Sequence, residues 1–177
     1  MAVDHVKSTP LTNLDAAPPV AIQSGKGAAG VLNHIQGSAT ALASSSVDAT
    51  YQFVRVRSNV KIKHLYFESA AQTAGKFDLG VYYATNGELQ KPTALLAADA
   101  IDQDFFASAI DAASAVTRAD VVNESTTYTA AKRNQPLWEA LGLASDPGGW
   151  FDIVATVVTT AVTTGTGIMT LEAEFVH

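Results

Sequence analysis

The sequence predicts an all-β protein, a jelly-roll-like β-sandwich of about eight antiparallel strands with one short helix, preceded by an extended N-terminal arm. Most of the chain after residue 25 consists of short runs rich in Val, Thr, Ile, Tyr and Phe. Many of these runs alternate apolar with polar residues, which is the period of a half-buried strand. Turn-forming residues separate the runs, and no repeat of about 20 to 50 residues indicates a solenoid or a propeller.

The first 24 residues show neither the helical nor the strand period, and their prolines block a helix. We therefore expect an extended arm over residues 1–24 and a sandwich domain over residues 25–177. An arm of this kind is ordered by contact with a neighbour. The residues that we expect to form this assembly interface are Val3, Leu11, Leu14, Pro18, Pro19, Val20 and Ile22.

Strand patterns follow the arm. Residues 31–35 open a first strand, and residues 37–43 continue it past a bulge or a turn. Residues 51–57 and 60–67 both alternate, and Ser58-Asn59 forms a two-residue joint between them. The spacing predicts that these two strands are neighbours in one sheet.

Residues 77–83 form the next strand, because Phe77, Leu79, Val81 and Tyr83 share one face. Asn86-Gly87 then predicts a tight turn, since both residues tolerate positive φ angles. Residues 100–116 fit either a short helix or a loop followed by a strand, and the pattern favours irregular structure.

Near the C-terminus, residues 136–142 predict a short helix that begins at a proline and ends at a glycine. Two β-rich runs follow, over residues 150–159 and 167–176. The second run places apolar residues on one side and Thr and Glu on the other. This pattern predicts a long hairpin with one solvated face.

The composition excludes several classes of protein. The chain has 177 residues, no cysteine, 11 basic and 17 acidic residues, and a net charge of −6. The absence of cysteine rules out disulfides and thiolate sites, and the scattered basic residues argue against a nucleic-acid partner. The N-terminus lacks the pattern of a secretory signal, and no apolar run reaches the roughly 20 residues of a membrane helix. Only 16% of the residues are charged, so we expect partners to cover part of the surface.

No local motif indicates a cofactor, a metal or a catalytic site. Gly25-Lys26-Gly27 lacks the spacing of a phosphate-binding loop. The four histidines are not spaced to bind one metal from a single element, so only the fold can bring them together. They are His5, His34, His64 and His177. We therefore expect a protein that is not an enzyme.

Two other groups of residues fit a chemical role, but a structural role explains each of them better. Asp102, Asp104 and Asp111 contain a possible carboxylate pair for glycoside hydrolysis, but loop and cap positions explain them better. Trp138 and Trp150 could stack on a sugar, but their position favours packing at the end of the sandwich.

Several stretches of the domain carry a resemblance to a known family. The chain resembles small structural proteins of tailed bacteriophage virions, in particular the jelly-roll decoration (cement) proteins on the outside of the capsid. The stretches are 51–65, 75–83, 101–109, 137–143, Asp146-Pro147 and 150–155.

The resemblance implies a structural role on the exterior of a virion that is assembled in the host cytoplasm. The expected partners are the major capsid protein, across whose subunits the chain would bind to stabilise the shell, and further copies of the chain, with a trimer favoured. The resemblance supplies no catalytic residue. Two alternatives stay open: a tail, neck or baseplate component of the virion, and a carbohydrate-binding receptor module.

Overall fold

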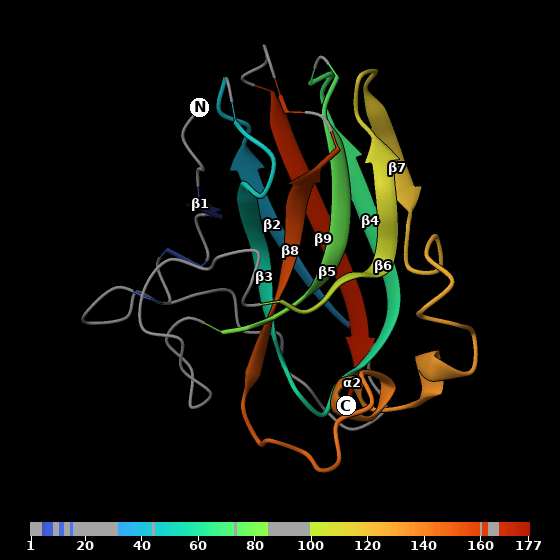
Figure 1. Ribbon diagram of the computed structural model, residues 1–177. Helices are drawn as coiled ribbons and strands as arrows, with labels where there is room; N and C mark the ends of the chain where they lie inside the picture. The colour runs from blue at the N-terminus through green and yellow to red at the C-terminus, as the bar shows by residue number, and fades with distance from the viewer. Residues whose placement is uncertain are drawn as a thin grey trace.

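The computed structural model describes residues 5–8, 11, 12, 15, 32–43, 45–72, 74–84, 100–159, 161, 162 and 167–177. These residues form two β-sheets that pack face to face (Figure 1). The five-stranded sheet contains, in spatial order, β1 (His5–Lys7), β3 (Thr50–Arg57), β8 (Trp150–Val158), β5 (Lys76–Tyr83) and β6 (Ala100–Asp111). The four-stranded sheet contains β2 (Asn33–Thr40), β9 (Ile168–Val176), β4 (Lys61–Ser69) and β7 (Val116–Asp120).

The strands from β2 through β9 pair in the way of one long hairpin that is rolled up on itself. β5 and β6 form the closed end of this hairpin, and β4 with β7, β3 with β8 and β2 with β9 continue it as antiparallel pairs. Rolling places β4 beside β9 and β5 beside β8, again antiparallel. This is the topology of a jelly roll. The predicted all-β, jelly-roll-like sandwich is confirmed.

Aromatic rings fill the space between the sheets. Tyr51 and Phe77 meet edge to face at 6.1 Å between ring centroids, and Phe53 and Phe67 do so at 6.2 Å. These four side chains are fully buried. Edge-to-face pairs of this kind add to the stabilisation that burial of the rings already gives.

A short helix closes one end of the sandwich. The 3₁₀ turn η2 (Lys132–Asn134) leads into α2 (Leu137–Ala140), which lies beside the C-terminus in Figure 1. The first amides of α2 donate to the turn between β3 and β4, from Leu137 to the carbonyl of Val60 at 2.8 Å and from Trp138 to that of Ser58 at 3.0 Å. The helix predicted over residues 136–142 is confirmed, although it makes only one turn.

Two predicted strand pairings are wrong for one reason. The runs assigned to neighbouring strands or to a hairpin lie in different sheets, since β3 and β8 belong to the five-stranded sheet while β4 and β9 belong to the four-stranded one. In a rolled hairpin, consecutive strands often cross from one sheet to the other. Alternation within a strand does not reveal this crossing, because it indicates which face is buried but not which strand is adjacent.

The structure corrects three other expectations. Residues 100–111 form a strand instead of irregular structure, and register shifts against β5 explain its obscured alternation. β2 pairs with β9 over its whole length without a bulge. The N-terminal region contributes β1, which runs parallel to β3, so the sandwich is not entirely antiparallel.

Some predictions fall outside the described residues, among them the turn at Asn86-Gly87 and the loop Gly25-Lys26-Gly27. The boundary between arm and domain also falls there and stays a prediction. Among the described residues, no helix has the length and apolar character that crossing a membrane requires.

Gly37 allows the two sheets to approach closely at one side of the sandwich. A Cβ atom at this position would overlap the carbonyl group of Phe53 in β3. Any side chain at residue 37 must therefore push β2 away from β3.

We expect Gly37→Ala to lower the free energy of unfolding by about 2 to 3 kcal/mol, the usual cost of overpacking. Urea unfolding followed by intrinsic fluorescence measures the change. Gln36→Ala, at an exposed position of the same strand, is the control and should stay within about 0.5 kcal/mol of the parent. An equal, small effect of both substitutions would contradict the close approach.

Candidate functional site

The outer face of the five-stranded sheet is buried around β3 and β8. Arg55 pairs with Asp152, and Gln52 with Val154, on the face turned away from the core. These residues are at most 6% exposed. Because a two-layer sandwich usually leaves the outer faces of its sheets to solvent, further parts of the chain must cover this one.

Part of the cover is the N-terminal segment, by which we mean residues 5–8, 11, 12 and 15. β1 pairs with β3 in parallel, from His5 opposite Thr50 to Lys7 opposite Gln52. One helical turn follows, in which the amide of Asp15 donates to the carbonyl of Leu11 at 3.0 Å. Leu11 itself is 2% exposed. The turn carries Asp15 back over the sheet.

A β-bulge in β3 fits the segment to the sheet. The register between β3 and β8 shifts between Gln52 and Val54, so Phe53 is the extra residue. A bulge leaves backbone hydrogen-bonding groups of the strand pair without partners, and Ser8 forms hydrogen bonds to the backbone at this point. Its hydroxyl donates to the carbonyl of Phe53, and its amide donates to the carbonyl of Gln52 at 2.6 Å.

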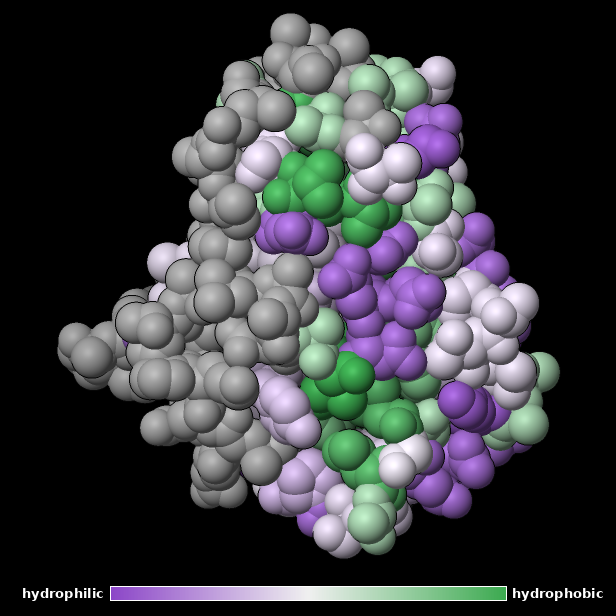
Figure 2. Space-filling view, viewed as in Figure 1, coloured by the Kyte–Doolittle hydropathy of each residue, from purple (hydrophilic) through white to green (hydrophobic). Residues whose placement is uncertain are grey.

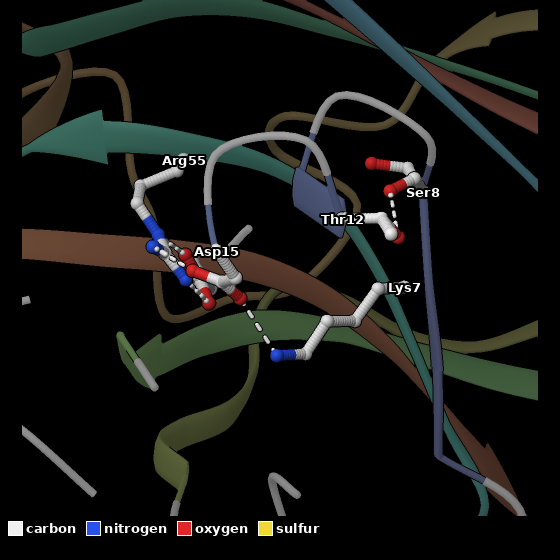
Figure 3. A network of polar contacts seen from close by, with 6 residues as sticks. Lys7, Ser8, Thr12, Asp15 and Arg55 are labelled. Carbon is white, nitrogen blue, oxygen red and sulfur yellow. Dashed lines mark hydrogen bonds and ion pairs between the residues drawn. The ribbon is translucent and has the colours of Figure 1, made fainter. Parts of the chain in front are cut away.

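Four charged side chains join the segment to the sheet (Figure 3). Arg55 donates two hydrogen bonds to Asp152, from Nε to Oδ1 at 2.6 Å and from Nη2 to Oδ2 at 2.9 Å. The remaining Nη1 donates to Oδ1 of Asp15 at 2.8 Å, and Nζ of Lys7 donates to Oδ2 of Asp15 at 2.6 Å. Two cations face two carboxylates, so the charges of these four described residues balance.

Burial and charge act against each other in this cluster. Burial raises the pKa of Asp15, but the hydrogen bond from Lys7 and the charge of Arg55 outweigh it and hold that pKa below its ordinary value. Burial raises the pKa of Asp152, although Arg55 opposes the shift. Burial also disfavours the charge on Arg55, but both carboxylates together raise its pKa. Each charge of the cluster is therefore compensated by a neighbouring charge of opposite sign.

One polar group of the site lacks a hydrogen bond. The side-chain amide of Gln52 is fully buried, and neither its nitrogen nor its oxygen has a hydrogen-bond partner among the described residues. An unpaired buried amide costs roughly 1 to 3 kcal/mol. The docked segment thus leaves one buried amide of the site without hydrogen bonds to the described residues.

The predicted interface residues can be compared with this site only at one position. Leu11 lies in the segment and is buried within the single chain. The other six, Val3, Leu14, Pro18, Pro19, Val20 and Ile22, lie outside the described residues. Their role in assembly stays a prediction.

Sequence reasoning missed the residues that hold the segment. A signal was present, because Arg55 lies between Val54 and Val56, and Asp152, of opposite charge, lies between Phe151 and Ile153. Charged residues at such positions are buried only when they are paired. Nothing in the sequence indicates that Asp15, Lys7 and Ser8 complete the arrangement.

The histidines and acids considered for chemistry are distributed over the sandwich. His34 and His64 lie on either side of Glu174 on the outer face of the four-stranded sheet. His64 contacts Asp120, with 2.7 Å between Nδ1 and Oδ2, and the described residues contain no group of three potential metal ligands that converge. The fold thus brings two of the four histidines to one face.

Of the three aspartates, Asp102 and Asp104 lie together on β6. Burial raises the pKa of Asp102, and the hydrogen bond with Asp104 and the charge of Asp104 raise it further. Asp111 is instead used locally, since its carboxylate accepts from the amide of Ala113 at 2.9 Å. The structure therefore separates the three acids into a pair and a turn residue.

The tryptophans do not form an open platform. Trp138 packs against the hydrophobic core, as predicted for a ring at the end of the sandwich. The guanidinium of Arg57 lies over the ring of Trp150, 4.1 Å from its centre. This contact occupies one face of the ring that a sugar would need.

Fold and site together define a jelly-roll protein whose N-terminal segment is bound to the outer face of its own sheet. Comparable chains occur in solved structures of phage capsids. A chain of "Capsid of Ralstonia phage GP4" superposes with a TM-score of 0.63 over 97% of both chains, with 12% identical residues. A chain of "Cyanophage Pam1 capsid asymmetric unit" superposes with a TM-score of 0.50 over 91% of this chain and 95% of that one, with 13% identity.

At these identities the likeness establishes the fold. No protein-family model matches the chain, and no curated protein matches its sequence. The likeness in fold is therefore visible in the structure and not in the sequence comparisons.

We expect Asp152→Asn to lower the free energy of unfolding by about 3 kcal/mol, because it leaves the cation of Arg55 buried without its main partner. Thermal or urea unfolding measures the loss. Glu172→Gln is the matched control, since it removes a carboxylate from the exposed ion pair with Arg118 and should cost less than about 1 kcal/mol. If the two variants were equally stable, the buried cluster would not hold the sheet.

The depressed pKa of Asp15 predicts a dependence on pH. The stability that Asp15 adds is present above its unfolded pKa and is lost as the pH falls through the lower folded pKa, that is, below about pH 4. Asp15→Asn should therefore be less stable than the parent at neutral pH, and the difference should shrink as the pH falls. Urea unfolding at a series of pH values tests this, and a difference that stays constant down to acid unfolding would contradict it.

Proposed function

We propose that the chain is a non-enzymatic structural protein of a tailed-phage virion, namely a decoration (cement) protein that binds across major capsid protein subunits and stabilises the shell from outside. One observation carries the proposal. The jelly roll matches a chain of a phage capsid over 97% of both chains, so the likeness in fold extends over nearly the whole of this chain.

The character of the site also supports a structural role. The carboxylates of Asp15 and Asp152 are 8% and 0% exposed, and each is bonded to a cation. A general base or a nucleophile must reach its substrate, and these groups cannot. The most perturbed acids of the N-terminal site thus hold the fold together and leave no reactive group open.

The surface is suited to contacts with other proteins. Charged residues make up only 16% of the chain. Figure 2 shows a hydrophilic region on the described surface with hydrophobic residues on two sides of it. Leu42, Val47 and Ile168 are 39% to 60% exposed, and all three lie near the end where β2 stops and β9 begins. Such surfaces lose little free energy on desolvation.

In this proposal the chain assembles with copies of itself, with a trimer favoured, on the exterior of a capsid in the host cytoplasm. The arm residues Val20 and Ile22 contact the shell. Since Lys7, Ser8 and Asp15 already bind the sheet of the chain, the part of the arm beyond residue 15 is the part that serves as an anchor.

Co-sedimentation with undecorated capsids tests the proposal. We expect saturable binding at a fixed ratio to capsid subunits, and we expect the double variant Val20→Asp, Ile22→Asp to bind at least tenfold more weakly, because two apolar anchors become charged. Deleting residues 1–24 would be a poorer test, since it removes β1 and Asp15 and so disturbs the fold.

The control is Gln36→Ala, which changes an exposed residue of β2 and should bind as the parent does. Absence of binding to shells by the folded parent would overturn the decoration proposal. Equal binding of the parent and the arm variant would reject the arm as the anchor, and Ile168→Asp would then test the exposed end of β2 and β9.

A further inference from the structure

We infer that the N-terminal segment is exchanged between copies of this chain, so that the segment of one copy occupies the site on β3 of another. The site consists of Gln52, Phe53, Arg55 and Asp152, and we call it the acceptor site.

The acceptor site recognises the segment through groups that do not depend on chain connectivity. The parallel ladder joins β1 to residues 50–52, the hydroxyl of Ser8 binds the carbonyl of Phe53, and Asp15 binds Arg55. Each of these contacts joins the segment to β3. A segment from another copy would present the same groups and make the same contacts.

Covalent geometry permits the exchange. Sixteen residues, 16–31, connect Asp15 to the next described part of the chain at Leu32. A connection of that length can span up to about 55 Å when fully extended, which exceeds the radius of gyration of about 16 Å that is typical of a domain of this size. The connection is therefore long enough to reach an adjacent copy, and the site does not require that the segment belong to the same chain.

The acceptor site can also stay intact while the segment moves. Two of the three hydrogen bonds that Arg55 makes in the cluster go to Asp152, and only one goes to Asp15. Departure of the segment leaves Arg55 and Asp152 as a bonded, neutral pair. The unpaired amide of Gln52 further lowers the free energy that docking gains. Both features favour release and rebinding over permanent attachment.

Concentration decides which copy supplies the segment. The contacts are equal within a chain and between chains, so the balance depends on effective concentration, which is on the order of millimolar for a segment tethered in the same chain. Copies that are packed side by side offer a comparable concentration. Exchange of identical elements is a low-cost route to oligomers, and it would link neighbouring copies without a new interface.

Because the chain contains no cysteine, only the introduced cysteines can form disulfides in the test. Lys7 lies opposite Gln52, and His5 opposite Thr50. Chains with Lys7→Cys are mixed with chains with Gln52→Cys, unfolded in urea, refolded together at high concentration and oxidised. The pair His5→Cys and Thr50→Cys is treated in the same way. We expect disulfide-linked heterodimers, identified by the 7–52 or 5–50 peptide in mass spectrometry, at a yield several times that of the control and rising with concentration.

The control mixture contains Lys7→Cys and Ala130→Cys, since Ala130 is exposed and lies outside the site. The double variants Lys7→Cys, Gln52→Cys and His5→Cys, Thr50→Cys show at high dilution that the pairs close within one chain. Closure in these double variants with no heterodimer above the control in the mixtures would overturn the inference. The experiment uses the chain alone, so its result is independent of whether the chain binds a capsid.

Discussion

The ion pair between Arg55 and Asp152 is the constraint on which the arrangement of the N-terminus depends. It lies in the middle of a sheet, between two central strands, on a face that a simple sandwich would leave in water. Burying both charges is favourable only if every hydrogen-bonding group is used. Asp152 uses two of the guanidinium nitrogens, and Asp15 uses the third. The N-terminal segment therefore completes the hydrogen bonding of this pair, and the segment has a defined place because the sheet contains the pair.

The jelly roll explains why the fold class could be predicted while several pairings could not. Alternation identified β3, β4, β5 and β9 as strands, because each has one face in the core. Adjacency in a rolled hairpin is set by contacts between residues about a hundred positions apart, such as Arg55 opposite Asp152. No local pattern contains that information. The same holds for β6, whose shifts in register against β5 interrupt the alternation from which a strand is recognised.

The site could be predicted in part. Arg55 lies between two valines and Asp152 lies between Phe151 and Ile153, and their opposite charges indicate a buried pair. The segment that covers them could not be predicted in the same way. β1 has only three residues, too few for a period to be recognised, and it is held by the Phe53 bulge and by Asp15. Both features exist only in the folded chain.

The docked segment places a chemical requirement on any partner that is to take it over. Such a partner must present a free strand edge, a carbonyl in the place of that of Phe53, and a cation in the place of Arg55. A second copy of the chain meets all three requirements without further design, whereas an unrelated capsid surface meets them only if it has evolved the same groups. This asymmetry divides the arm into two parts. The N-terminal segment is suited to link copies of the chain, and in the proposed function the residues beyond 15, which include Val20 and Ile22, would bind the shell. The proposed exchange and the proposed binding to a capsid are therefore compatible, because the two sets of contacts do not compete for the same residues.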